Sequence, residues 1–338
     1  MLRIGILGAS GIAPAAVIRP AQRRDDVEIV AVGSRRQGSA AEYAGRHAIS
    51  RAYGSYQELL GDPEVDLVYN ALPLSEHAEW SIRAMERGKN VLCEKPFAMN
   101  AFEARKMRDT ADRTGRRLIE AFHDRYHPLS LELDAVKASE RLGRIISIRA
   151  EFSASIPYDS DSIRHDPHAG GGSLMDLGCY PVHWVRSFLR EEPQVSSAKA
   201  TLNALGADMS MEADLKFPSG AAATVFCTMD EGPVVQTFDV VGSLGTLHVN
   251  GLVFPSYGHR IEESIAGLPR VRTVQGTETY DHQLDAIVRG LKSGEPLLTE
   301  GADSVRNMTV IDAIYEASGV RTTTTPATAS SYIDKDVQ

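Results

Sequence analysis

The sequence predicts an α/β protein in two parts, a doubly wound parallel sheet followed by an α+β domain with an antiparallel sheet. Over residues 2–122, short apolar runs alternate with helical segments, which indicates βαβ units and therefore a parallel sheet. After a helix at 128–139, apolar and polar residues alternate one by one, as in antiparallel strands with one solvated face. We therefore divide the chain into a first domain, residues 1–122, and a second domain, residues 123–338.

The elements of the first domain follow from apolar runs and their end signals. Each expected strand is a short apolar or β-branched run, and each expected helix has apolar residues at helical spacing. Ser55 is the predicted N-cap of one helix, whereas Gly88 and Gly115 are predicted to end two others. The predicted strands span 2–7, 27–32, 66–72, 91–93 and 118–122, and the predicted helices span 14–24, 56–60, 76–87 and 101–114.

In the second domain, strict alternation marks the strands. Residues 146–152 and 211–217 carry apolar side chains at every second position, which predicts two strands with one wet face. Two helices, at about 282–292 and at 302–318, are expected to close the fold. From Thr322 on, the chain is rich in Thr, Ala and Ser and is expected to fray.

Composition and charge argue against several classes of function. A net charge of −9 disfavours nucleic acid or an anionic membrane as the main partner. No apolar run approaches the roughly 20 residues that cross a bilayer, and the first residues lack the pattern of a signal peptide. Three cysteines without a CxxC pair indicate a reducing compartment and no metal cluster. We expect a cytoplasmic protein that binds a small molecule and no metal.

A glycine motif follows the first predicted strand and opens the first helix. In this context Gly8-Ala9-Ser10-Gly11-Ile12-Ala13 indicates dinucleotide binding, because backbone N–H groups and the positive helix end can meet a pyrophosphate. The match to the usual fingerprint is imperfect, since Ser10 replaces the middle glycine, and a tight turn without a ligand is the alternative. The predicted cofactor contacts here are Gly8, Ser10, Gly11 and Ile12.

The end of the second strand favours NADP over NAD. An acidic residue there would bind the 2′-hydroxyl of NAD, whereas this chain has Gly33-Ser34-Arg35-Arg36. Arginine forms charge-assisted, fork-like bonds to phosphate, so Ser34, Arg35 and Arg36 are candidates for the 2′-phosphate of NADP. The alternative is that both arginines are solvated loop charges.

Two further motifs carry candidate chemistry. Lys95 follows the strand at 91–93, and open α/β sheets place ligands at the carboxyl ends of their strands. The glycines at 170–172 precede Asp176, Tyr180 and His183, which are spaced to share one helix face, with Ser173 or Asp176 able to start that helix. This second group fits a phosphate loop, a proton-transfer site or a polar seam in a core.

These motifs together resemble the glucose-fructose oxidoreductase / inositol dehydrogenase / MocA (Gfo/Idh/MocA) family. The resemblance rests on Glu94-Lys95-Pro96, on residues 66–73 followed by His77, and on the run from Gly170 to Tyr180. It implies an N-terminal Rossmann domain and a C-terminal α+β domain with a large open antiparallel sheet. It also implies hydride transfer between NAD or NADP and a carbon of a sugar or cyclic polyol, in a homodimer or homotetramer that associates through the sheet.

The resemblance assigns roles to particular residues. Lys95 matches the active-site lysine, with a cis peptide expected before Pro96, and Asp176 matches a carboxylate near the substrate. Tyr180 and the segment 121–128 resemble the branch of dimeric dihydrodiol dehydrogenase and the NADP-dependent xylose dehydrogenases, whereas His183 departs from the family pattern. Leu72, Pro73, His77, Glu94 and Lys95 complete the predicted cofactor contacts, and the predicted substrate-binding residues are Arg125, Arg164 and His183.

The predicted chemistry needs a proton donor and acceptor beside the reacting carbon. We assign this role to Tyr180, with Lys95 as the cation that lowers its pKa and Asp176 as an orienting group. Alternatives within the same chemistry are a trans-dihydrodiol or anhydro-sugar dehydrogenase or reductase. A non-catalytic dinucleotide-sensing regulator would bind NADP without turnover, and a hydrolase that uses the cofactor transiently would cleave its substrate with no net change in NADPH.

Overall fold

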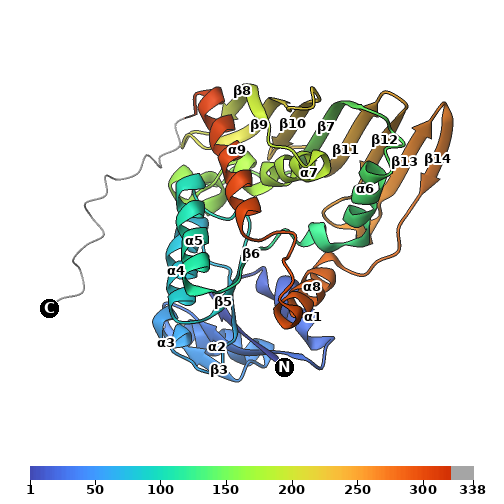
Figure 1. The fold of residues 1–338 in the computed structure, drawn as a ribbon. Helices are drawn as coiled ribbons and strands as arrows, with labels where there is room; N and C mark the ends of the chain where they lie inside the picture. The colour runs from blue at the N-terminus through green and yellow to red at the C-terminus, as the bar shows by residue number, and fades with distance from the viewer. Residues whose placement is uncertain (321–338) are drawn as a thin grey trace.

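Six parallel strands form the first sheet, in the order β3-β2-β1-β4-β5-β6. The computed structural model describes residues 1–320 (Figure 1). The order reverses between β1 and β4, so the carboxyl ends of these two strands flank the switch point where doubly wound sheets bind ligands. The strands span Leu2–Leu7 (β1), Val27–Gly33 (β2), Arg51–Tyr53 (β3), Leu67–Asn70 (β4), Asn90–Cys93 (β5) and Leu118–Glu120 (β6).

The helices of this domain agree with the sequence except at one place. The first begins as a π-helical segment, Pro14–Ile18, and continues as α1, Arg19–Gln22. As predicted, Ser55 caps α3 by accepting from the Glu58 N–H. The helix α2 and strand β3 were not predicted, because α2 has few large apolar side chains to mark a helical period and β3 is only three residues long. The remaining helices are Gln37–His47 (α2), Tyr56–Leu60 (α3), His77–Glu86 (α4) and Ala101–Thr114 (α5).

Eight strands form the second sheet, in the order β14-β13-β12-β11-β7-β10-β9-β8. The prediction of an antiparallel sheet is correct for every pair but one, since β7 and β10 run parallel through its centre. Along β9 the predicted alternation is observed, with Met211, Ala213 and Leu215 buried and the residues between them turned outward. The strands are Ile145–Ser153 (β7), Gln194–Leu202 (β8), Asp208–Lys216 (β9), Ala222–Thr228 (β10), Val235–Gly242 (β11), Gly245–Asn250 (β12), Arg260–Ile265 (β13) and Leu268–Arg272 (β14).

Four further helices join the two sheets. Two of them, α6 (Pro128–Ala138) and α7 (Cys179–Leu189), lie over one face of the second sheet (Figure 1). The last helix, α9 (Ala302–Ser318), packs against α5, α7 and β8. Before it, α8 (Thr279–Ser293) returns to the first sheet, where Leu284, Ile287 and Val288 share a core with Ile4 and Ile6. The part of the chain after residue 123 therefore also contributes a helix to the core of the first sheet.

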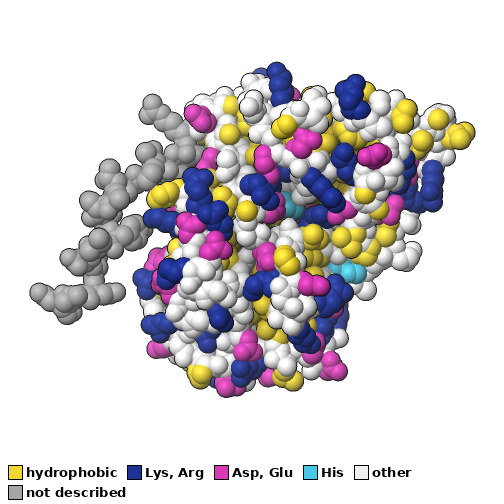
Figure 2. All heavy atoms as spheres, viewed as in Figure 1, with side chains coloured by type: hydrophobic (Ala, Val, Ile, Leu, Met, Phe, Trp, Pro, Cys, Tyr) yellow, Lys and Arg dark blue, Asp and Glu magenta, His cyan; other side chains and the backbone are white. Residues whose placement is uncertain are grey.

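Charges of both signs are mixed over the surface. Lys and Arg side chains are interspersed with Asp and Glu over the face drawn in Figure 2. Within residues 1–320, no helix is long and apolar enough to cross a bilayer, and no three His, Cys, Asp or Glu side chains are grouped to hold a metal. The segment from Thr322, which was expected to fray, lies outside the described residues.

Candidate active site

The glycine motif after β1 opens one end of a long cleft. Gly8 has a φ of 91°, and a Cβ at this position would lie 3.1 Å from the Leu72 side chain, so the turn requires glycine. Within residues 1–320, the N–H groups of Ser10, Gly11 and Ile12 donate to no protein acceptor. These free donors at the start of the first helix fit the pyrophosphate of a dinucleotide.

Predicted cofactor residues and several unpredicted ones line the cleft. Gly8, Ser10, Ser34, Arg35, Arg36, Leu72 and Pro73 all lie on its wall. The unpredicted helix α2 adds Ser39, Glu42, Tyr43 and Arg46, and the second domain contributes Ile163. Tyr43 donates its hydroxyl to the Ser10 carbonyl at 2.9 Å, which holds the glycine motif in place. The side chain of Arg35 is 75% exposed, with its Nη1 3.8 Å from Glu76 Oε1, so a phosphate can reach it from solvent.

Lys95 joins the first domain to the helix of the second glycine motif. It follows β5, and its peptide bond to Pro96 is cis, as expected. Its Nζ donates to the backbone carbonyl of Asp176 at 2.6 Å and to Asp176 Oδ1 at 3.1 Å. Arg164 Nη1 lies 3.2 Å from the other carboxylate oxygen. The structure therefore brings together three predicted residues: Lys95, Asp176 and Arg164.

The pairing keeps both Lys95 and Asp176 charged. Burial alone would lower the pKa of Lys95, but the Asp176 carboxylate raises it above its ordinary value. Burial alone would raise the pKa of Asp176, but Lys95 and Arg164 hold it below its usual range. The site thus presents a stable ammonium group at neutral pH.

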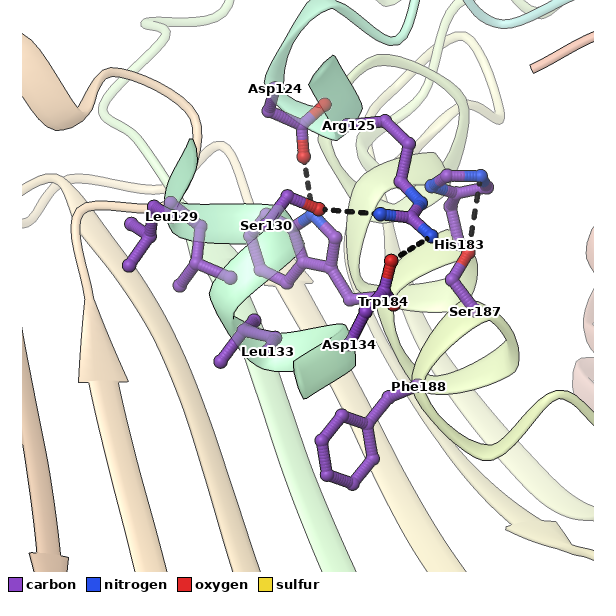
Figure 3. A pocket seen from close by; sticks show the side chains of 11 residues that line it. Asp124, Arg125, Leu129, Ser130, Leu133, Asp134, His183, Trp184, Ser187 and Phe188 are labelled. Atoms are coloured by element: carbon purple, nitrogen blue, oxygen red, sulfur yellow. Dashed lines mark hydrogen bonds and ion pairs between the residues drawn. The ribbon is translucent and has the colours of Figure 1, made fainter. Parts of the chain in front are cut away.

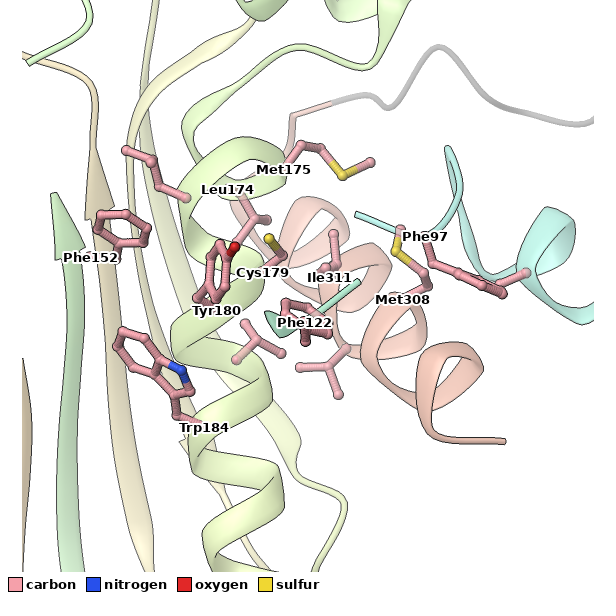
Figure 4. Packing of buried hydrophobic residues seen from close by; sticks show 14 of the residues in the cluster. Phe97, Phe122, Phe152, Leu174, Met175, Cys179, Tyr180, Trp184, Met308 and Ile311 are labelled. Atoms are coloured by element: carbon pink, nitrogen blue, oxygen red, sulfur yellow. The ribbon is translucent and has the colours of Figure 1, made fainter. Parts of the chain in front are cut away.

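Tyr180 lies beside this ammonium in an aromatic pocket (Figure 4). Lys95 Nζ is 5.2 Å from the centroid of the Tyr180 ring, and the rings of Phe122 and Phe152 approach at centroid distances of 5.2 and 5.5 Å. Burial raises the pKa of Tyr180 well above its ordinary value, so in the free site it outweighs any lowering of this pKa by the Lys95 ammonium. Tyr180 therefore carries its proton at neutral pH.

A histidine that sequence reasoning missed contacts the Tyr180 hydroxyl. His123 Nε2 lies 3.2 Å from Tyr180 Oη, and His123 Nδ1 lies 2.6 Å from Thr279 Oγ1. His123 belongs to the segment 121–128 that carries part of the family resemblance. No spacing rule, however, pairs a residue after β6 with one on α7, 57 positions away. Only the folded structure, which packs the segment after β6 against α7, reveals this contact.

The N-terminal end of the helix that carries Tyr180 is held by Asp208, a residue of strand β9. Ser173 donates its hydroxyl, and Leu174 its N–H, to Asp208 Oδ2 on β9, both at 2.7 Å. Gly172, at a φ of 128°, must be glycine because a Cβ would clash with Asp208 Oδ1. The helix begins with a π-helical turn, Leu174–Gly178, and Ser173, one of the two expected starts, occupies its N-cap position without a side-chain capping bond. The glycine run therefore serves close packing, not phosphate binding.

Two predicted cofactor residues point elsewhere. His77 is buried, and its ring nitrogens contact the carbonyl oxygens of Pro96 and Leu72 at 3.1 and 2.9 Å. The His77 side chain therefore braces the loops beside the cleft. Glu94 accepts a hydrogen bond from Tyr69 at 2.5 Å, so its carboxylate is engaged within the first domain.

Two predicted substrate residues line a different, small cavity (Figure 3). Arg125 donates to Ser130 and to Asp134 at 3.0 and 2.8 Å, which ties it to α6. His183 stacks on Phe122 and contacts Asp303 at 3.1 Å, so it is turned toward α9. Asp176 lies within the π-helical turn, which changes the spacing to the residues after it. Asp176 and Tyr180 both contact Lys95, whereas His183 does not share this side. Arg125 and His183 are thus better explained as structural residues.

Comparison with known proteins identifies the family. A model described as "Oxidoreductase family, NAD-binding Rossmann fold" matches residues 2–122, and one described as "GFO/IDH/MocA C-terminal domain" matches residues 131–248. D-xylose 1-dehydrogenase (NADP(+)) 2 of Haloferax volcanii is 36% identical, covering 94% of this chain and 97% of the relative. The chain belongs to the Gfo/Idh/MocA oxidoreductase family.

Other relatives in the Gfo/Idh/MocA family are similar over most of their length. Trans-1,2-dihydrobenzene-1,2-diol dehydrogenase of Xenopus laevis is 30% identical over 87% of this chain and 91% of its own. The aldose-aldose oxidoreductase of Caulobacter crescentus, solved with glycerol, has a TM-score of 0.86 at 25% identity, over 94% and 97% of the chains. The 3-ketoreductase KijD10 of Actinomadura kijaniata, solved with NADP and TDP-benzene, has a TM-score of 0.84 at 25% identity, over the same shares.

Membership of the Gfo/Idh/MocA family confirms the predicted fold class and the predicted resemblance. The protein is an NAD(P)-binding oxidoreductase with a Rossmann sheet and a large, mostly antiparallel second sheet.

Proposed function

We propose that the protein is an NADP-dependent dehydrogenase or reductase acting on a CH–OH group of a sugar or cyclic polyol. One observation carries the proposal: Lys95, paired with Asp176, lies over the Tyr180 ring at the carboxyl end of β5. This strand end adjoins β4, whose following residues line the dinucleotide cleft. A cation and a phenol beside that cleft are the groups that a carbonyl–carbinol interconversion needs.

Tyr180 and Lys95 handle the proton in this scheme. When bound, the nicotinamide dinucleotide supplies or accepts a hydride at the substrate carbon. In reduction, Tyr180 Oη–H breaks and its proton bonds to the carbonyl oxygen, while Lys95 stabilises the resulting phenolate until water reprotonates it. In oxidation, Tyr180 first gives its proton to water, and the phenolate, stabilised by Lys95, then takes the hydroxyl proton of the substrate. Asp176 and Arg164 orient Lys95 and the substrate hydroxyls.

The preference for NADP is supported by the cleft and by relatives. Arg35 and Arg36 are exposed on its wall, and no acidic residue ends β2. A relative named D-xylose 1-dehydrogenase (NADP(+)) and a 3-ketoreductase solved with NADP support the same choice.

A trans-dihydrodiol or anhydro-sugar substrate is the second candidate. The 30% identity to an enzyme named trans-1,2-dihydrobenzene-1,2-diol dehydrogenase favours the dihydrodiol. The intact set of Lys95, Asp176 and Tyr180 argues against a non-catalytic regulator.

The deciding experiment is a rate screen with NADP and with NAD over aldoses, inositols, anhydro-sugars and trans-dihydrodiols. We expect NADP-dependent turnover of at least one sugar or polyol. Turnover of dihydrodiols alone would favour the second candidate. Tight NADP binding without turnover of any compound would contradict both.

We further propose a cytoplasmic homodimer or homotetramer that associates through the second sheet, with the domain boundary near residue 123. The exposed apolar side chains of Ile146 on β7 and Val241 on β11 support association through that sheet. Sedimentation of the purified protein tests the assembly, and a monomer at micromolar concentration would contradict it.

A further inference from the structure

A chain of three buried side chains runs from the candidate proton donor to helix α8. Tyr180 Oη lies 3.2 Å from His123 Nε2, and His123 Nδ1 lies 2.6 Å from Thr279 Oγ1. All three residues are at most 3% exposed. The His123 ring packs against Tyr280 and Phe254 at centroid distances of 4.0 and 5.5 Å, which fixes its orientation.

Burial, and then the charge of Lys95, lowers the pKa of His123 to about 3. The imidazole is therefore neutral near neutral pH and carries one N–H, either on Nδ1 or on Nε2. The two tautomers send the hydrogen bonds of the chain in opposite directions. The choice between them decides where the Tyr180 proton points.

The two directions of the hydrogen-bond chain differ in which hydroxyl group is left without an acceptor. With the proton on Nδ1, His123 donates to Thr279 and Tyr180 donates to His123. The buried Thr279 hydroxyl proton then has no acceptor, because within residues 1–320 its only hydrogen-bond contact is His123. With the proton on Nε2, Thr279 donates to His123 and His123 donates to Tyr180. The one donor then left without a protein acceptor within residues 1–320 is the Tyr180 hydroxyl, the group that is proposed to reach the substrate oxygen.

We propose that His123 is a positioning residue that donates its Nε2–H to Tyr180 Oη, held in that tautomer by the Thr279 hydroxyl. This leaves the Tyr180 O–H free to point at the substrate oxygen. The same bond stabilises the phenolate that forms when Tyr180 gives up its proton, and it adds no second positive charge beside Lys95. The inference rests on the proposed role of Tyr180 as the proton donor and acceptor.

The kinetic test replaces the two supporting residues. His123→Phe keeps a flat ring but removes the donor, so kcat should fall about 10- to 100-fold, the usual effect of a lost bond to a charged group. The KM values should change less than about threefold. His123→Gln retains an N–H and should lose less. Thr279→Val should slow the reaction, whereas Thr279→Ser, which keeps the hydroxyl, should not.

A double-mutant comparison separates positioning from a merely structural role. In a Tyr180→Phe background there is no phenol to position, so adding His123→Phe should change the residual rate less than about twofold. An equal loss in both backgrounds would overturn the proposal, as would a rise in KM at unchanged kcat. Thermal melting of each variant identifies any loss that comes from unfolding.

A spectroscopic test needs no turnover. In histidine-selectively ¹⁵N-labelled free protein, the His123 signals, assigned by their absence in His123→Phe, should report a neutral Nε2–H ring that does not titrate between about pH 5 and 9. An Nδ1–H ring, or titration near pH 6.5, would overturn this inference while leaving the proposed function standing. Wild-type rates in Tyr180→Phe would instead overturn the proposed function. They would also overturn the proposed role of His123 in positioning the Tyr180 hydroxyl.

Discussion

The ammonium group of Lys95 donates a hydrogen bond to the backbone carbonyl oxygen of Asp176 at 2.6 Å. This bond links the end of β5 in the first sheet to the π-helical turn that carries Tyr180 toward the second. Because the acceptor is a backbone atom, the position of Lys95 depends on the fold as well as on the Asp176 side chain. The position of Lys95 relative to Tyr180 therefore depends on how the two sheets pack against each other.

Replacing Lys95 by methionine should abolish most activity. The change keeps the length of the side chain but removes the charge that stabilises the phenolate and the developing oxyanion, so kcat should fall about 10²- to 10³-fold. Steady-state rates on the best substrate measure this. Lys106→Met, on an exposed part of α5, is the matched control and should keep wild-type rates. A Lys95→Met enzyme with near-normal kcat would contradict the role of the ammonium.

Removing the exposed arginines after β2 should weaken NADP binding selectively. Arg35→Ala and Arg36→Ala each remove a donor available to a 2′-phosphate, so the Kd for NADP should rise about tenfold while that for NAD stays within twofold. Fluorescence titration measures both constants. Arg105→Ala, on exposed α5, should change neither. Equal loss of NADP and NAD affinity would show that the arginines do not contact the 2′-phosphate.

Asp208→Ala should destabilise the protein. The change leaves the Ser173 hydroxyl, the Leu174 N–H and the Tyr315 hydroxyl without their acceptor in a buried site. We expect a loss of about 3 kcal/mol in the free energy of unfolding, since each orphaned donor costs about 1–3 kcal/mol and the site relaxes in part. Urea denaturation measures it, with exposed Asp230→Ala as the control. A loss no larger than that of the control would refute the capping role.

Glu120 should make stability fall as pH rises. Burial raises its pKa from an ordinary value of 4.5 to about 8. Between these values the native state holds a proton that the unfolded state has released, so folding becomes less favourable with increasing pH. Glu120→Gln should flatten that part of the profile in urea melts at pH 5 and 8. Exposed Glu28→Gln should leave the slope intact. An unchanged slope in Glu120→Gln would place the pH dependence elsewhere.

Sequence reasoning located features that depend on local pattern. The bounds of α5 and α9, the Ser55 cap and the cleft residues around Gly8 follow from periodicity and turn chemistry. Contacts between residues that lie far apart in the sequence could not be predicted from local pattern. Asp208 caps a helix 34 positions away, and His123 meets Tyr180 across 57. The prediction that His183 shares a helix face with Asp176 assumed 3.6 residues per turn, and the π-helical turn has a different spacing.

Tyr180→Phe tests the central claim most directly. The variant keeps the ring that packs on Phe122 and Phe152 and removes only the hydroxyl that is proposed to exchange the proton. Single-turnover rates should be measured with saturating NADPH and the best carbonyl substrate, together with the Kd for NADPH. The account predicts a loss of about 10²- to 10⁴-fold in the hydride-transfer rate, with the Kd unchanged within twofold. A rate within threefold of wild type would contradict it.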